Sequence, residues 1–227
     1  FHEHLGFNPQ NSIMIPNGFQ TFEHSNLKYK KSQLRSKLNL NQEDFVFGHV
    51  GRFHPMKNHK LFIEMAKIIS QKIRNAKFVM VGRDVNPQNE SLKKLIQEFG
   101  MEKKFILLGE QKNINDIYKI INILCVTSKW GESFPNVIAE AMLNGVPCVT
   151  TNIGDSELIV GKNGKVVKNI NKFEFSNNCI ELFKELKSSK NNLIFDTRNH
   201  IIKNYKISEI VKDYEIFFDK IRKTYIR

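Results

Sequence analysis

The sequence predicts an α/β fold in which a doubly wound, Rossmann-like parallel sheet carries helices on both faces. Short apolar segments rich in Val, Ile and Phe alternate along the chain with stretches whose apolar residues recur at helical spacing. The first short segment, 45–50 (FVFGHV), is apolar nearly throughout, as is typical of a parallel strand buried on both faces. Such alternation favours right-handed crossovers and places a ligand site beyond the carboxyl ends of the strands.

The individual elements follow in order from the same patterns. Strands are predicted at 45–50, 78–81, 105–108, 121–126 and 146–150. Helices are predicted at 60–73, 90–99, 115–120, 136–143, 173–186 and 208–221, from apolar residues at helical spacing. Asn144-Gly145 is a typical helix stop after 136–143. Residues 188–192 (SSKNN) are predicted to form a loop.

Length and composition indicate one globular domain. The 227 residues, 41% of them hydrophobic and 26% charged, can form a full core, which excludes a mini-protein and a wholly disordered chain. We expect residues 1–227 to form a single domain, with 1–41 as linker and lead-in and 206–227 as a C-terminal helix. Because the chain begins with Phe1 rather than Met, we expect a fragment or a processed product.

Charge and cysteine content indicate partners and compartment. The formal net charge of +12 favours phosphates or an anionic membrane surface. Basic segments at 28–37 and 220–227 would suit anionic lipid, with solubility as the alternative reason for them. Three cysteines without metal-ligand spacing indicate a reducing compartment, and no apolar run is long enough to span a bilayer. We therefore expect a cytoplasmic protein, with peripheral contact at the inner face of the membrane as an open possibility.

Two glutamates bracket the start of the helix predicted at 136–143. Glu132 and Glu140 are separated by seven residues, and Pro135 suits a first helical turn. The backbone N–H groups of 133–137, at the positive end of the helix dipole, would bind a phosphate. Glu132 would then face the group that the phosphate carries, and Glu140 could accept hydrogen bonds from a ribose diol. The alternative is a pair of solvated surface glutamates, but the apolar neighbours of Glu140 favour a functional role.

Two cations follow the first predicted strand. Gly51 lets the backbone turn closely, Arg52 comes directly after it, and Lys57 follows five residues after Arg52. Arginine can bind two phosphate oxygens while lysine acts as a mobile point charge, so the pair suits a diphosphate. The alternative is that both belong to the solvated surface of a chain with 35 basic residues.

Several motifs, taken in order, resemble those of one known family. These are NGF near Asn17, GRFHPMKNH, FVMVGRD, FILLGEQ, ESFPNVIAEAMLNGVPCVTTNIGDSELI and NGKVV. Over about residues 13–168 the chain resembles the C-terminal, donor-binding half of the retaining GT-B glycosyltransferases called glycosyl transferases group 1. The family often has Asp where this chain has Gln20, and Gly-Gly where this chain has Gly154-Asp155.

The resemblance implies a role for each candidate site residue. Arg52 and Lys57, beside Gly51, would hold the donor diphosphate, Glu132 would contact sugar hydroxyls, and Glu140 would bind the ribose. Arg52, Lys57 and Glu132 would be the catalytic residues. The remaining donor contacts would come from Gly109 and Glu110 near the base and from Ser133, Phe134, Pro135, Asn136 and Val137.

The implied reaction is transfer of a sugar from a nucleoside-diphosphate sugar to an acceptor hydroxyl with retention of configuration. UDP-hexose or UDP-N-acetylhexosamine is favoured as donor and a GDP-sugar is possible. The setting would be bacterial surface polysaccharide, lipopolysaccharide or glycolipid assembly. No metal or other cofactor is expected, because the cations and the helix N-terminus can stabilise the departing diphosphate. A lipid-linked or saccharide acceptor would be held mainly by an N-terminal domain outside this chain, which alone would turn over poorly.

Two other functions remain open from the sequence. The net charge would suit a basic nucleic-acid-binding module, but no RNP-like strand, G-x-x-G loop or zinc knuckle accompanies it, so no nucleic-acid partner is expected. A sugar-nucleotide epimerase or a phosphorylase of the same fold is the second alternative, since a fold does not determine chemistry.

Overall fold

The sheet has the predicted parallel architecture. A computed structural model describes residues 6, 13–21, 27–188 and 192–225. Its strands are β1 (Phe45–Val50), β2 (Ala76–Val81), β3 (Phe105–Leu107), β4 (Ile123–Val126), β5 (Cys148–Thr151) and β6 (Lys165–Val167). They form one six-stranded sheet in the order β3-β2-β1-β4-β5-β6, in which every neighbouring pair is parallel. The predicted fold class is confirmed.

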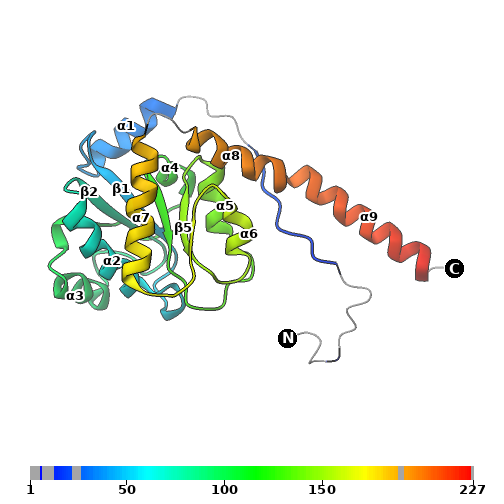
Figure 1. The fold of residues 1–227 in the computed structure, drawn as a ribbon, viewed down its shortest axis with the longest axis horizontal. Helices are drawn as coiled ribbons and strands as arrows, with labels where there is room; N and C mark the ends of the chain where they lie inside the picture. The colour runs from blue at the N-terminus through cyan, green and yellow to red at the C-terminus, as the bar shows by residue number, and fades with distance from the viewer. Residues whose placement is uncertain (1–5, 7–12, 22–26, 189–191, 226–227) are drawn as a thin grey trace.

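The helices lie on both faces of this sheet (Figure 1). They are α1 (Leu27–Lys37), α2 (His59–Lys72), α3 (Glu90–Glu98), α4 (Ile114–Tyr118), α5 (Asn136–Leu143), α6 (Ser156–Val160), α7 (Lys172–Lys187), α8 (Leu193–Asn204) and α9 (Ile207–Tyr225), with 3-10 turns η3 (Pro55–Lys57) and η4 (Glu102–Lys104). The strand predicted at 45–50 and the helix predicted at 136–143 have the predicted bounds, and the other predicted strands and helices are present with shifted ends. β6, α6 and α8 were not among the predicted elements, and α1 lies in the stretch predicted as linker and lead-in. Most of the predicted 188–192 loop, and much of the 1–41 lead-in, lie outside the described residues.

Two apolar layers explain why the strands are apolar on both faces. Phe78 and Met80 of β2 pack into a cluster with α2, α3 and α7, whereas Val79 and Val81 pack into a second cluster with α4, α5, α6 and α8. Successive side chains of a strand point to opposite faces, so both faces of this strand must be apolar. Rings stack through the first layer, with the centroids of Phe47 and Phe78 5.6 Å apart.

The direction of winding reverses between β1 and β4. From β1 the chain proceeds outward through β2 to β3, then returns to β4 on the other side of β1 and continues to β6. The loops that leave the carboxyl ends of β1 and β4 therefore diverge and leave a crevice between them, where parallel sheets of this kind bind ligands.

The C-terminal helix extends beyond the sheet (Figure 1). The segment 13–21 reaches the start of α9, where Phe19 N donates to Tyr205 O at 2.8 Å and Ile207 N donates to Phe19 O at 3.0 Å. Gly18 allows this approach, because a Cβ at that position would lie 2.8 Å from Ile207 Cα. Within the described part of the chain, no helix combines the length and the apolar character needed to cross a bilayer.

Candidate functional site

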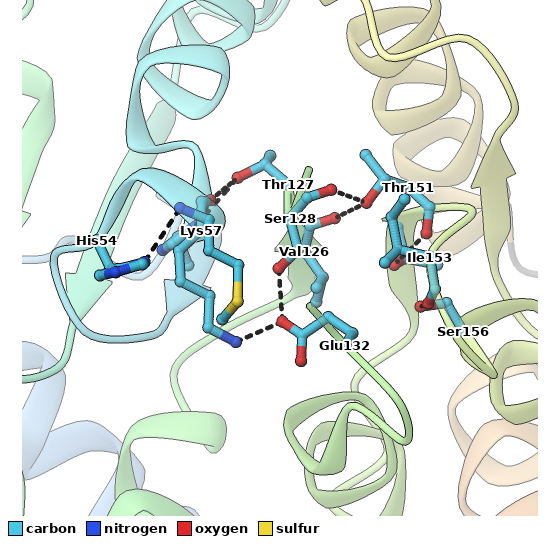
Figure 2. A network of polar contacts seen from close by, with 12 residues as sticks. His54, Lys57, Val126, Thr127, Ser128, Glu132, Thr151, Ile153 and Ser156 are labelled. Carbon is cyan, nitrogen blue, oxygen red and sulfur yellow. Dashed lines mark hydrogen bonds and ion pairs between the residues drawn. The ribbon is translucent and has the colours of Figure 1, made fainter. Parts of the chain in front are cut away.

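A cation and an acid from two different loops meet at the reversal of the sheet (Figure 2). Lys57 Nζ lies 2.5 Å from Glu132 Oε1, and the two side chains are only 15% and 11% exposed. The same carboxylate oxygen accepts a hydrogen bond of 2.7 Å from Ser128 Oγ. Lys57 ends η3, whose first turn is capped by His54 through a 3.2 Å hydrogen bond from Met56 N. Local turn geometry and a long-range ion pair together fix the Lys57 side chain.

Backbone contacts lock the loop after β1 to the loop after β4. Thr127 Oγ1 donates to Lys57 O at 2.8 Å, and His49 Nε2 lies 3.2 Å from the same carbonyl oxygen. Lys129 N donates to Met56 O at 2.8 Å. The two loops are therefore held together by hydrogen bonds to backbone carbonyls as well as by the Lys57–Glu132 ion pair.

The loop after β5 supports the same site from the other side. Thr151, the last residue of β5, donates from Oγ1 to Ser128 O at 2.6 Å (Figure 2). In the loop that follows, Asp155 N donates to Ser133 O at 2.8 Å. Gly154 has φ +58°, and a Cβ there would lie 2.3 Å from Ser133 O. Glycine is required at this position because a side chain would displace the segment that carries Glu132.

A cleft of about 380 Å³ adjoins the ion pair. Its lining includes four of the predicted donor-binding residues, namely Gly51, Arg52, Glu110 and Glu140. Lys57 and Glu132 do not line the cleft themselves. Lys57 lies beside it at Gly51, where a Cβ would be 3.2 Å from Lys57 Cγ and Cδ, and Glu132 is paired with Lys57. The structure thus brings the two predicted cations and both predicted acids to one end of the sheet.

Glu140 is held by a buried tyrosine. Helix α5 begins at Asn136, directly after Pro135, and Glu140 follows about one turn later. Tyr118 OH donates to Glu140 Oε2 at 3.0 Å. Tyr118 is fully buried, and this burial, together with the Glu140 carboxylate, raises the pKa of Tyr118 well above its usual value. The phenol therefore stays protonated and acts as a hydrogen-bond donor.

The side chains of three other residues predicted to contact the nucleotide-sugar donor point away from the cleft. The Phe134 ring stacks on Phe19 at 6.2 Å, and Asn136 Oδ1 accepts from Asn17 Nδ2 at 2.8 Å, so both face the 13–21 segment. Val137 packs partly against the second apolar layer. For these residues only the backbone N–H groups are placed to contact a ligand near the start of α5.

Gly109 shapes the turn that presents Glu110 to the cleft. It has φ +65°, its N–H donates to Val85 O at 2.7 Å, and its carbonyl accepts from Gly82 N at 2.9 Å. Gly109 therefore joins the loops that follow β2 and β3, while Glu110 beside it lines the cleft.

Comparison with known proteins agrees with this geometry. A sequence profile described as glycosyl transferases group 1 matches residues 30–207. The chain belongs to the glycosyl transferases group 1 family.

Several known proteins are similar to this chain in sequence or in fold. The chain is 32% identical over 231 residues to an Escherichia coli UDP-Gal:alpha-D-GlcNAc-diphosphoundecaprenol alpha-1,3-galactosyltransferase, covering 98% of this chain and 56% of the relative. It is 24% identical over 199 residues to the N-acetyl-alpha-D-glucosaminyl L-malate synthase of Bacillus anthracis, covering 86% and 51%. Anabaena Alr3699/HepE, solved with UDP and glucose, shares the fold with a TM-score of 0.80 at 22% identity, covering 96% of this chain and 59% of that protein. The chain therefore spans about half the length of the curated relatives that it matches.

Two buried histidines behind Lys57 are uncharged at neutral pH. His49 and His59 lie with ring centroids 4.5 Å apart. Burial lowers the pKa of His59 to about 4 and the pKa of His49 well below its usual value. The positive charge at this cleft therefore belongs to Arg52 and Arg83, which line it, and to Lys57 beside it.

Ser128 and Tyr118 were not among the predicted site residues. Ser128 precedes Glu132 by only four positions, and this closeness in sequence was a weak indication that the two side chains could be in contact. Tyr118 lies 22 residues before Glu140 and reaches it only through the packing of α4 against α5, which no local pattern reveals. Among the described residues, no group of three or more His, Cys, Asp or Glu side chains could hold a metal ion.

Proposed function

We propose that the chain binds a nucleoside-diphosphate sugar and forms the donor-binding domain of a retaining glycosyltransferase. The observation that carries this proposal is the arrangement at the carboxyl end of the sheet. Arg52 and Glu140 line one cleft, and the Lys57–Glu132 pair borders it. A diphosphate needs cations, and a sugar and a ribose need acceptors for their hydroxyl groups, so the arrangement matches the three parts of such a donor.

The catalytic contribution of these residues is electrostatic. Arg52 and Lys57 neutralise the negative charge that grows on the diphosphate as it departs, and the N–H groups at the start of α5 add to this effect. The Lys57 ammonium has three donors, so it can contact Glu132 and a phosphate oxygen at the same time. Glu132 accepts hydrogen bonds from the sugar, and Glu140 accepts them from the ribose.

The donor is a UDP-hexose or a UDP-N-acetylhexosamine in this proposal, with a GDP-sugar as the alternative. A uridine base is favoured because the Escherichia coli relative is named for UDP-Gal and because HepE was solved with UDP. No metal takes part, since the cations of the chain supply the charge that a metal would supply elsewhere. Unchanged nucleotide affinity in the presence of a chelator would support this point, and a loss that Mg²⁺ restores would contradict it.

The acceptor is a lipid-linked or saccharide hydroxyl in bacterial surface polysaccharide or glycolipid assembly. The name of the Escherichia coli relative, which includes a diphosphoundecaprenol, supports a lipid-linked acceptor. We place most of the acceptor site in an N-terminal domain outside this chain, and the whole protein in the cytoplasm with peripheral contact to the membrane.

Ligand-dependent thermal unfolding tests the proposal. UDP or GDP at millimolar concentration should raise the melting temperature of the 227-residue chain. Glu140→Ala should weaken the effect of the nucleotide, whereas Glu132→Ala should leave it in place and reduce the discrimination between UDP-sugars. No response to either nucleotide, or equal losses in the two variants, would contradict the assignment.

Two further assays separate the alternative functions. Salt-sensitive retention of single-stranded RNA without any nucleotide response would support a nucleic-acid-binding module instead. An epimerised donor rather than a glycosylated acceptor, found with the full-length protein, would support an epimerase.

A further inference from the structure

Each of the two acids is held at one carboxylate oxygen by a hydroxyl group from a buried residue. Ser128 Oγ donates to Glu132 Oε1, and Tyr118 OH donates to Glu140 Oε2. Ser128 and Tyr118 are 1% and 0% exposed, so neither hydroxyl can bind a donor sugar from solution. We propose that Ser128 and Tyr118 are positioning residues, each of which fixes one oxygen of an acid and directs the other toward the donor. This inference rests on the proposed function.

The contact of Tyr118 with Glu140 determines how α5 presents its acid. Tyr118 ends α4, and its ring lies within the second apolar layer together with Ile138 of α5. A buried phenol has one O–H to donate in a hydrogen bond, and the carboxylate of Glu140 accepts that hydrogen bond. Glu140 lines the cleft. Its Oε2 accepts the hydrogen bond from Tyr118, and no described residue donates to its Oε1, so Oε1 can accept a hydrogen bond from a ligand.

The backbone of Ser128 is held in place by a hydrogen bond of its own. Its carbonyl accepts from Thr151 Oγ1 at 2.6 Å, which ties the end of β4 to β5. Glu132 Oε1 then receives both Ser128 Oγ and Lys57 Nζ. Two donors on one oxygen restrict the rotation of the carboxylate, so Oε2 keeps one direction.

Loss of the two hydroxyls should therefore weaken the binding of different parts of the donor: loss of the Tyr118 hydroxyl that of the nucleoside, and loss of the Ser128 hydroxyl that of the sugar. Tyr118→Phe keeps the ring and its packing but frees Glu140, so UDP should bind about tenfold more weakly while inorganic pyrophosphate binds as before. Ser128→Ala frees Glu132, so pyrophosphate and UDP should bind as before. The affinity of a UDP-sugar relative to UDP should fall about three- to tenfold in that variant.

Titration calorimetry on the 227-residue chain tests this separation. The probes are pyrophosphate, UDP, UDP-glucose, UDP-galactose and UDP-N-acetylglucosamine. Ser176→Ala is the matched control, because Ser176 is also 0% exposed and its Oγ donates to Phe173 O at 3.1 Å on α7, away from the cleft. This control should bind every probe as the wild type does.

A double-mutant cycle distinguishes positioning from a general structural effect. If Tyr118 acts through Glu140, Tyr118→Phe in a Glu140→Gln background should weaken UDP binding less than twofold further. Equal losses for pyrophosphate and UDP, or a full tenfold loss in the Glu140→Gln background, would overturn the role of Tyr118. A wild type that prefers no UDP-sugar over UDP, or a Ser128→Ala variant with unchanged preference, would overturn the role of Ser128.

The same titrations separate this inference from the proposed function. A wild type that binds neither pyrophosphate nor UDP contradicts the proposed function, and the positioning roles fall with it. A wild type that binds both, with variants that behave as Ser176→Ala does, contradicts the positioning roles alone.

Discussion

At the scale of single residues, the 2.5 Å contact between Lys57 and Glu132 means that the acid offsets part of the positive charge of Lys57. Replacing Glu132 by Gln removes a negative charge from beside Lys57 in a poorly hydrated setting. Inorganic pyrophosphate should then bind about three- to tenfold more tightly to Glu132→Gln than to the wild type. Titration calorimetry measures this directly. Lys57→Ala serves as the opposite control and should bind pyrophosphate about tenfold more weakly than the wild type. Weaker pyrophosphate binding by Glu132→Gln would contradict the assigned contact.

The buried histidines should make the stability of the protein depend on pH. Burial lowers the pKa of His59 from about 6.5 to about 4, so the folded state holds this side chain neutral where the unfolded chain would protonate it. The associated stability is therefore complete above pH 6.5 and is lost as the pH falls toward 4, by at most about 3 kcal/mol. Denaturant unfolding at several pH values measures the change.

His59→Gln provides the comparison for that measurement. It removes the titrating group, so the free energy of unfolding of the variant should fall less between pH 6.5 and pH 4 than that of the wild type. Parallel pH profiles for the two proteins would show that His59 does not contribute.

Residue types and spacing predicted the acids and cations of the site but not their supports. Glu132 and Glu140 were identifiable because seven residues and a helix start separate them, and Arg52 and Lys57 because they follow a buried strand. Tyr118 was not identifiable, because its hydrogen bond depends on how two helices pack across the second apolar layer.

At the scale of elements, the loop after β5 should control the position of Glu132. Gly154→Ala places a Cβ 2.3 Å from Ser133 O at φ +58°, so the backbone that carries Glu132 must shift. We expect a lower melting temperature and a reduced preference for UDP-sugars over UDP. Strain from the positive φ alone costs about 1–2 kcal/mol.

Gly100→Ala is a matched control for that substitution. Gly100 has φ +61°, but a Cβ there would meet only Lys67 Nζ at 3.9 Å. Both variants carry the backbone strain, and only Gly154→Ala adds a collision. Equal losses of stability, with unchanged preference among sugars in both, would show that the loop does not position Glu132.

Elements with a clear apolar pattern were predicted, and elements without one were missed. The main strands have apolar residues on both faces and the main helices have apolar stripes, and each pattern spans enough residues to be distinctive. β6 has three residues and α6 has five, so neither shows a period. β3 and α4 are equally short but were predicted, β3 because all three of its residues are apolar. α8 carries a polar, charged sequence whose buried residues include Thr197, so its inner face is less apparent.

At the scale of the whole molecule, α9 carries one of the two basic segments on which the membrane prediction depends. Ile216 and Phe218 are 68% and 61% exposed on this helix, and Lys220, Arg222 and Lys223 follow them. The chain should sediment with vesicles that contain phosphatidylglycerol and stay in solution with vesicles of phosphatidylcholine alone. Added salt should release it. Equal sedimentation with both kinds of vesicle, or none with either, would contradict a role for anionic lipid.

The overall fold class followed from the order of elements, whereas the path of the chain ends did not. Right-handed crossovers restrict the possible sheets to a few, so alternation of strands and helices was sufficient. The approach of Gly18 to Ile207 joins positions 189 residues apart and depends on the absence of a side chain at one of them. No local pattern predicts such a contact.

A crystal structure of the chain with UDP would locate the nucleotide relative to the sheet. The diphosphate is expected within hydrogen-bond distance of Arg52 and Lys57, with the ribose hydroxyl groups at Glu140. A second cleft of about 950 Å³, lined in part by Arg35, Asp44 and Asn122, provides the contrasting position near the amino ends of β1 and β4. UDP bound there, or elsewhere without contact to Lys57 and Glu140, would contradict a donor site at the carboxyl ends of the strands.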